Sequence, residues 1–252
     1  MSILLNAQNI NKTYILGVGN TNHVLKDISL QVSKGDFVSV MGPSGSGKST
    51  LLYSISGMDR VDSGSVELCG SKITEMSEVE LSSFRLNKIG FIFQKHSLLK
   101  NLNILDNIVL PAFMAKKATR QEIVERAKEL MALTGISELE NNDITEASGG
   151  QLQRVAICRA LINNPDIIYG DEPTGALNSK AATEVMDILA KLNQNGTTIV
   201  LVTHDSKVAM KTNRVLFMKD GVIVGEKYLG QYNYENAKRE EELSSWLSQL
   251  GL

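Results

Sequence analysis

The amino-acid sequence predicts an α/β fold with a strand-rich N-terminal part and an inserted helical block. A glycine-rich loop at 42–50 joins a short apolar strand to a helix, which is a junction typical of α/β cores. From residue 166 onward, β-branched stretches alternate with helix-forming stretches. Residues 95–165 carry helix signals and no strand signal. Together these observations predict an α/β core interrupted by a helical subdomain.

The composition limits the class of protein. The chain has 252 residues, which suits one large α/β domain, alone or with a subdomain. A net charge of -2 gives no bulk positive field for nucleic acid, so no nucleic-acid partner is expected. Cys69 and Cys158 fit neither a disulfide framework nor a metal knuckle, which favours a reducing compartment. No 18-residue apolar run and no basic leader occur, so we expect neither a membrane span nor a signal peptide.

The first ninety or so residues are predicted to form mostly strands, with one helix before the last of them. Strands are predicted at 29–32, 37–41, 66–68 and 89–93. Ser77 and Glu80 form a capping box that opens a helix to about Asn87. The last strand of this part ends at Gln94.

Between the second and third of these strands, the glycine-rich loop has the P-loop pattern G-x-x-x-x-G-K-[S/T]. Its residues are Gly42, Pro43, Ser44, Gly45, Ser46, Gly47, Lys48, Ser49 and Thr50. The glycines let backbone N–H groups turn toward phosphates, and the helix N-terminus adds partial positive charge. Lys48 can reach the β- and γ-phosphates, and the Ser49 hydroxyl can ligate Mg²⁺. The pattern predicts nucleotide binding; the alternative is a chance Gly/Ser-rich turn.

Two helices are predicted in the block at 95–165. Thr119 and Glu122 form a capping box for a helix that Gly135 closes. The second helix runs from Gly149 to about Ile162 and stops before Pro165.

The C-terminal third alternates strands and helices. Strands are predicted at 167–169, 197–202, 215–218 and 222–224. Ser179 is predicted to cap a helix that ends at Gly196, and Asp220-Gly221 is a hairpin turn. Leucines and Trp246 at helical spacing near the C-terminus predict a packed helix, with a partner-binding helix as the alternative.

The strand at 167–169 leads into two adjacent acids, Asp171 and Glu172, which is a Walker B pattern. Asp171 would hold Mg²⁺ through water, and Glu172 would polarise the attacking water as general base. A kinase would instead need a substrate hydroxyl site and lid arginines, so this acid pair favours hydrolysis. The alternative is a strand that ends in solvated acids.

A second anion site is predicted where a serine and two glycines open a helix. Its residues are Ser148, Gly149, Gly150 and Gln151. Because the P-loop already supplies one phosphate cradle, this second site is predicted to grip a phosphate held by another subunit. An ordinary helix cap is the alternative.

With these motifs in place, the chain resembles the nucleotide-binding subunit of ABC transporters over about residues 3–225. The resemblance implies an α/β fold whose P-loop NTPase (RecA-like) core carries an N-terminal antiparallel β-subdomain and an inserted α-helical subdomain. It implies a cassette at 1–230, with the helical subdomain at about 95–165, and a C-terminal helical tail at 231–252. It also implies ATP and Mg²⁺ as cofactors, ATP hydrolysis, and an ATP-dependent dimer with a second copy of the chain.

The resemblance implies further site residues. Gln94 looks like the Q-loop glutamine that senses Mg²⁺ and the attacking water, and Tyr14 fits the adenine-stacking aromatic. His204 resembles the switch histidine. The D-loop would be formed by Ala176, Leu177 and Asn178. The implied catalytic residues are Glu172, His204, Lys48 and Gln94, and the implied metal residues are Ser49, Gln94 and Asp171. A plain core tyrosine and a structural histidine are the alternatives for Tyr14 and His204.

Two positions depart from the family pattern. The family usually has Leu at 147 and Asp at 178, where this chain has Ala147 and Asn178. Neither departure touches Lys48 or Glu172, so ATP hydrolysis is still expected and its rate is left open.

Within the family, the segments 93–99, 107–111 and 170–177 look like those of the MacB, LolD and antimicrobial-peptide resistance (BceA-like) group. That group implies a membrane permease as partner, with an extracytoplasmic adaptor also allowed. It places the chain at the cytoplasmic face of the cell membrane, peripheral through the permease. The implied role is export or mechanotransmission acting on peptides, antimicrobials or lipoproteins.

The segment after Gln94 is predicted to contact the permease through an exposed apolar patch of Leu98, Leu99, Leu102 and Ile104. Packing of these residues against 120–134 is the alternative. Two other functions remain open: a low-turnover regulatory ABC module, and a soluble ABC protein not engaged in transport.

Overall fold

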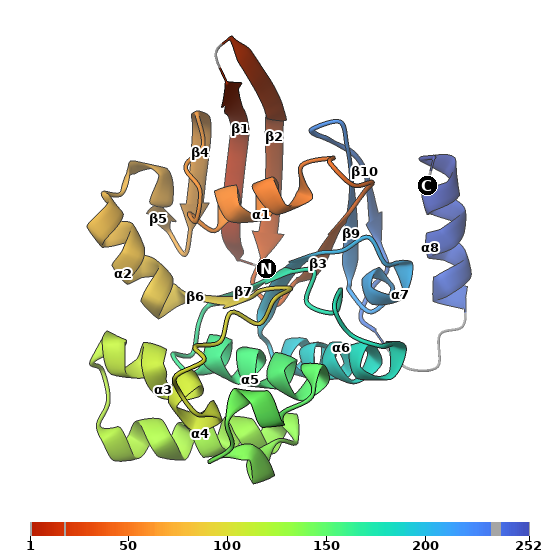
Figure 1. Ribbon diagram of the computed structural model, residues 1–252. Coiled ribbons are helices and arrows are strands. Elements are labelled where there is room, and N and C mark those ends of the chain that lie inside the picture. Colours follow the sequence, from red (N-terminus) through yellow and green to blue (C-terminus); the bar gives the residue numbers. More distant parts are fainter. Residues whose placement is uncertain (1, 18, 233–237, 252) are drawn as a thin grey trace.

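The structure is a computed structural model that describes residues 2–17, 19–232 and 238–251. It contains two sheets and a helical block, with helices around them (Figure 1). A six-stranded sheet has the order β10-β9-β3-β8-β7-β6, and a four-stranded sheet has the order β2-β1-β4-β5. This confirms the predicted α/β class.

The six-stranded sheet forms the core and is parallel except at one edge. Its strands are β3 (Phe37–Met41), β6 (Ile89–Ile92), β7 (Ile167–Asp171), β8 (Thr198–Val202), β9 (Arg214–Lys219) and β10 (Val222–Tyr228). Only β10 pairs antiparallel, with β9, through the predicted hairpin. Buried parallel strands are apolar on both faces, and β3 and β8 are buried along their whole length. Because parallel strands end at the same edge, the segments after β3, β7 and β8 meet there.

The four-stranded sheet is the predicted N-terminal antiparallel β-subdomain. It consists of β1 (Ile3–Gly17), β2 (Asn20–Ser33), β4 (Ser63–Leu68) and β5 (Ser71–Lys72). Helix α1 (Lys48–Ile55) lies between this sheet and the core sheet. Its residues Leu51, Leu52 and Ile55 are fully buried in one cluster with side chains from both sheets. The sheets therefore fix α1, which begins at the P-loop.

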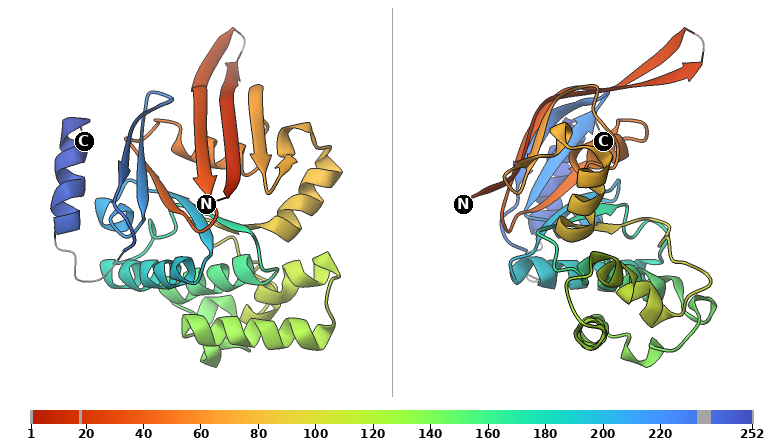
Figure 2. Two further views of the ribbon diagram at one scale, coloured as in Figure 1. Left: turned by 180° about the vertical axis from the view of Figure 1, so that it is seen from behind. Right: turned by 90° about the vertical axis from the view of Figure 1, so that its left-hand side faces the viewer.

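The helical block contains α3 (Ile104–Ala115), α4 (Arg120–Thr134) and α5 (Gly149–Leu161), with 3₁₀ turns at Ser137–Leu139 and Ile144–Glu146. It lies on one side of the core sheet, away from the four-stranded sheet (Figure 2). The capping box at Thr119 and the left-handed Gly135 at the end of α4 are present as predicted. Sequence reasoning did not predict α3, because Pro111 in its interior is a residue that normally ends a helix.

The remaining helices are α2 (Glu78–Lys88), α6 (Ser179–Gln194), α7 (Ser206–Ala209) and α8 (Lys238–Gln249), with a 3₁₀ turn at Ile73–Glu75. The prediction that Ser179 caps α6 is wrong. Asn178 is the cap, and its side-chain oxygen accepts a hydrogen bond from the Ala181 amide at 2.9 Å. The Asn178 side-chain amide, one residue before Ser179, can cap the helix because its oxygen reaches the free N–H groups of the first turn.

Helix α8 packs against the edge of the core sheet formed by β9 and β10 (Figure 1). Leu243 and Leu247 are buried in a cluster that includes Met41 and Phe217. The predicted packed helix near the C-terminus is therefore confirmed. Arg239, at the start of α8, is 2% exposed and donates hydrogen bonds to four backbone carbonyls, those of Met210, Thr212, Leu229 and Gly230.

Candidate functional site

At two points, the loop after β3 has a backbone conformation that only glycine permits. Gly42 has φ 151°, and a Cβ there would lie 2.0 Å from the carbonyl oxygen of Met218. Gly47 has φ 98° and is the N-cap of α1, and its Cβ would lie 3.0 Å from the carbonyl oxygen of Val24. Left-handed backbone and close approach both require the missing side chain. The loop therefore delivers the N-terminus of α1 to a fixed place beside β2 and β9.

This N-terminus opens onto a cavity of about 380 Å³. The cavity is lined by Asn22, Val24, Ser44, Gly45, Gly47, Lys48, Ser49, Thr50 and Glu172. The first N–H groups of a helix have no partner within the helix, so they are available to an anion. The P-loop residue Ser46 is buried, and its Oγ has no hydrogen-bond partner among the described residues. The volume lies within the range of small-molecule sites.

Lys48 brings a buried cation to this cavity. Its Nζ donates hydrogen bonds of 2.9 Å to the carbonyl oxygens of Gly42 and Pro43. Burial lowers the pKa of Lys48, and the carboxylates of Glu172 and Asp171 act in the opposite direction. The ammonium group therefore lies between the loop and the two acids, where a phosphate chain would be neutralised.

The donor set for a metal is formed by α1 and the end of β7. Ser49 Oγ donates to Asp171 Oδ1 at 2.8 Å. Hydroxyl and carboxylate oxygens suit Mg²⁺, which also keeps water and substrate phosphate as ligands. Within residues 2–17, 19–232 and 238–251, no three His, Cys, Asp or Glu side chains cluster to hold a metal by themselves. Ser49 and Asp171 therefore fit Mg²⁺ bound together with a nucleotide.

Glu172 lies beside His204 at the same edge of the sheet. The Nδ1 atom of His204 is 2.9 Å from Glu172 Oε1. Glu172 has φ 45°, an uncommon left-handed conformation that often accompanies function. A Cβ on Gly175 would lie 2.8 Å from Gln94 Nε2 and 3.2 Å from Glu172 Oε2, so both side chains border this glycine. The structure thus gathers three of the four predicted catalytic residues around one point, and the fourth, Lys48, lines the same cavity as Glu172.

Tyr14 is held by a separate polar cluster. Its hydroxyl donates to Asp59 at 2.6 Å, and Lys12 Nζ donates to the other oxygen of that carboxylate at 2.7 Å. Burial raises the pKa of Tyr14, and the bond to Asp59 adds to the effect. Burial also acts to raise the pKa of Asp59, but the bonds from Lys12 and Tyr14 lower it overall. Tyr14 does not line the cavity; it pairs across β1 and β2 with Asn22, which does.

The predicted second anion site has the form of a capped helix. Ser148 Oγ accepts from the Gln151 amide and Gln151 Oε1 accepts from the Ser148 amide, which is a capping box. A Cβ on Gly150 would lie 2.9 Å from Ala181 Cβ, so this segment lies tightly against α6. Ser148 is exposed, and no part of 148–151 lines the cavity among the described residues. Its pairing with another subunit's phosphate stays a prediction.

The D-loop residues lie beside this segment. A Cβ on Gly149 would be 3.6 Å from Leu177 Cδ2, while Ala176 and Asn178 are exposed. Ala147 is partly buried against the large apolar cluster of the helical block and α6.

Sequence reasoning missed three residues around the site: Asn22, Val24 and Tyr53. Asn22 and Val24 belong to β2, and only the folding of the hairpin over the P-loop brings them to the cavity. Tyr53 belongs to α1, and its hydroxyl donates to Asp171 Oδ2 at 2.5 Å. Its spacing of four residues from Ser49 is a signal that helix geometry could have supplied.

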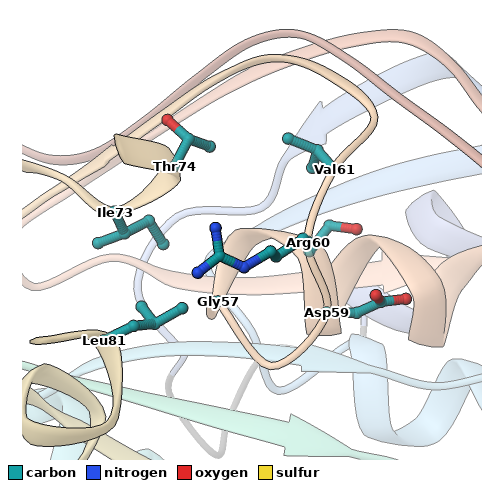
Figure 3. Close-up of a pocket in the computed structure, with 8 residues that line it drawn as sticks. Gly57, Asp59, Arg60, Val61, Ile73, Thr74 and Leu81 are labelled. Carbon is teal, nitrogen blue, oxygen red and sulfur yellow. The ribbon is translucent and has the colours of Figure 1, made fainter. Parts of the chain in front are cut away.

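Another cavity lies between the end of α1 and α2 and has a volume of about 60 Å³. The side chain of Arg60 extends into it toward Ile73 and Leu81 (Figure 3). It is too small for a nucleotide. The cavity beside the P-loop, which holds the N-terminus of α1 and the Lys48 ammonium group, is the candidate nucleotide site.

Comparison with known proteins decides the family. A family model described as ABC transporter matches residues 25–175. The chain belongs to the ABC transporter family. Family membership confirms the predicted resemblance and the ABC-type ATPase class.

Two relatives set the chain within the family. The bacitracin export ATP-binding protein BceA of Halalkalibacterium halodurans is 44% identical over 228 residues, covering 90% of this chain and 89% of that protein. The macrolide export ATP-binding/permease protein MacB of Mannheimia succiniciproducens is 46% identical over 207 residues, covering 82% of this chain and 32% of that protein. The chain thus spans about a third of the MacB relative. Both relatives agree with the predicted MacB and BceA-like group.

A solved structure confirms the cassette fold. The ATP-binding cassette MJ0796, in a dimeric post-hydrolysis state bound to ADP and Pi, matches with a TM-score of 0.84 and 39% identity. The match covers 91% of this chain and 100% of that one.

None of the helices within the described ranges has the length and apolar character needed to cross a bilayer.

Proposed function

We propose that this chain is the ATP-binding and ATP-hydrolysing subunit of a membrane transporter of the MacB and BceA-like type. The observation that carries the proposal is the meeting of Lys48, Asp171 and Glu172 at one edge of the core sheet, around the N-terminus of α1. The subunit would lie at the cytoplasmic face of the membrane through its permease. The moved molecule would be a peptide, an antimicrobial or a lipoprotein, with an extracytoplasmic adaptor as a further component.

Each side chain has a role that its position supports. The N–H groups of the P-loop and Lys48 hold the β- and γ-phosphates, and Tyr14 presents a fixed ring for the adenine. Ser49 and Asp171 would hold Mg²⁺, and the ion would supply positive charge next to the phosphates. Glu172 takes the proton of the attacking water, and His204 beside it donates to the transferred phosphate. Gln94 orients the water and the metal through its amide.

The working unit is proposed to be a dimer around two ATP molecules. Ser148 and Gly149 are exposed at a helix N-terminus, so this segment can meet a phosphate from outside the chain. The MJ0796 structures that this chain resembles are described as dimeric.

The two departures from the family pattern are accommodated locally. Asn178 keeps the N-cap of α6 that a carboxylate would provide, and Ala147 packs on the apolar cluster. Neither lines the cavity beside the P-loop. This supports hydrolysis over the low-turnover regulatory module.

The permease surface is proposed at a groove of about 380 Å³ between the core and the helical block. Met58, Phe93, Ser97, Met114 and Arg159 line it from several elements. Met58 and Met114 are 43% and 62% exposed, so an apolar side chain from a partner could bury them. Phe93 and Ser97 flank Gln94, which places the groove next to the predicted contact segment.

That contact segment is smaller than predicted. Ile104 is fully buried in the helical block, Leu98 packs against the same cluster and Leu102 is half-buried, so the prediction of four exposed apolar residues is wrong for these three. Leu99 is 45% exposed and remains available. The unpredicted α3 explains the difference, because it begins at Ile104 and directs that side chain inward.

Phosphate release by the purified chain tests the proposal. With ATP and Mg²⁺, we expect turnover that stops in EDTA and in a Lys48→Ala variant. If the wild-type chain turns over ATP no faster than Lys48→Ala, the regulatory module is favoured. If the chain is absent from membranes that contain the co-expressed permease, a soluble function is favoured.

A further inference from the structure

One carboxylate of the site is held by two hydroxyl groups from the same helix. Ser49 and Tyr53 are four residues apart on α1, so their side chains lie on one helix face. Ser49 Oγ donates to Asp171 Oδ1 at 2.8 Å, and the Tyr53 hydroxyl donates to Oδ2 at 2.5 Å. We propose that Tyr53 is a positioning residue for the metal-binding carboxylate of Asp171. This inference rests on the Mg²⁺ site of the proposed function.

Tyr53 is fixed by neighbours outside the P-loop. Its ring centroid lies 5.8 Å from that of Phe91 on β6, and Phe91 lies 4.4 Å from Phe93. These rings belong to the segment that leads into Gln94. The tyrosine hydroxyl is therefore anchored from the core sheet, independently of the glycine-rich loop.

Tyr53 is also kept in the donating form. Burial raises the pKa of Tyr53, and the bond to Asp171 acts in the same direction. Even at its ordinary pKa of about 10 a phenol is protonated at neutral pH, so the Tyr53 hydroxyl donates to the carboxylate of Asp171.

Two donors on opposite oxygens restrict how the carboxylate can rotate. The terminal torsion of an aspartate is broad when nothing holds it. Ser49 is itself a proposed metal ligand, so Tyr53 is the donor whose contact with Asp171 serves orientation alone. Partners of this kind typically contribute a factor of about 10–100 to metal affinity. The bond from Tyr53 to Oδ2 leaves Oδ1 on the side of the Ser49 hydroxyl.

The test is Tyr53→Phe, which keeps the ring on Phe91 and removes only the hydroxyl. Tyr169→Phe is the matched control. Tyr169 belongs to the same ring cluster, 6.3 Å from Phe91, but its hydroxyl donates to the Ile55 carbonyl instead of the carboxylate. For each protein, the affinity for a fluorescent ATP analogue is measured in EDTA and across a Mg²⁺ titration.

We expect all three proteins to bind the analogue equally in EDTA, within about twofold. The Mg²⁺ concentration for half-maximal tightening should rise about tenfold in Tyr53→Phe, from loss of an orienting partner, and stay unchanged in Tyr169→Phe.

An unchanged Mg²⁺ requirement in Tyr53→Phe would overturn the inference. An equal rise of the Mg²⁺ requirement in both variants would also overturn the inference, because the ring cluster would then be responsible. Loss of analogue binding in EDTA for Tyr53→Phe alone would overturn it too, because the fold would then be disturbed. If Mg²⁺ fails to tighten binding even in the wild-type chain, the proposed metal site itself is wrong.

Discussion

Replacing Glu172 by Gln removes one charge from the candidate site while keeping its shape. Glutamine has nearly the same volume, and its side-chain oxygen can still accept from His204 Nδ1, which lies 2.9 Å from Glu172 Oε1. The left-handed backbone at this position, φ 45°, is equally strained with either side chain. The free energy of unfolding should therefore change by less than about 0.5 kcal/mol.

The rate should change much more than the stability. A general base contributes roughly 10²–10⁴-fold, which corresponds to about 2.7–5.4 kcal/mol in the barrier. ATP binding should be kept or slightly strengthened, because Lys48 is untouched and a negative charge near the phosphates is gone. With binding intact and hydrolysis blocked, the ATP-bound dimer should accumulate.

Phosphate release, equilibrium ATP binding and gel filtration with and without MgATP measure these effects. Glu138→Gln, an exposed acid of the helical block, is the matched control and should behave as wild type. Turnover of Glu172→Gln within tenfold of wild type would refute the general-base assignment. A monomer peak at full nucleotide occupancy would refute the two-site dimer.

The remaining predictions concern the phosphate cradle, the second subunit, the permease and the C-terminal helix. Lys48→Ala should lose roughly 3 kcal/mol of ATP affinity, because a charge-assisted contact is removed. Ser148→Arg should keep ATP binding to the monomer and abolish hydrolysis; an equal loss of binding in both variants would contradict the assignment to another subunit. Leu99→Glu should leave the melting temperature and ATP binding intact but reduce co-purification with the permease, and retained co-purification would move the contact elsewhere. Arg239→Met should lower the free energy of unfolding, measured in urea, by about 3 kcal/mol, because it leaves buried carbonyls unpaired. The control Arg120→Met, at an exposed position, should leave this free energy unchanged. A loss below about 1 kcal/mol for Arg239→Met would show that α8 is held by its apolar face alone.

The sequence was sufficient for the features that depend on neighbouring residues. The P-loop glycines, the capping boxes at Ser77 and Thr119 and the adjacent acids Asp171 and Glu172 are local patterns, and the structure contains each of them. Local patterns work here because a turn or a cap is satisfied within four residues of chain. The order of these motifs was enough to predict the family and the inserted helical block.

Only the tertiary structure decided which distant groups meet. Strand order places β7 between β6 and β8, so Asp171 can face α1 and Glu172 can face His204. The same packing buries Ile104 and Arg239, which pattern and charge alone would place at the surface. Tyr53 shows the limit most clearly: its spacing from Ser49 is visible in the sequence, but the carboxylate that both hydroxyls reach comes from a strand more than one hundred residues away. Hydrophobic periodicity sets which face of an element is buried, whereas the pairing of elements sets the contacts of each polar group.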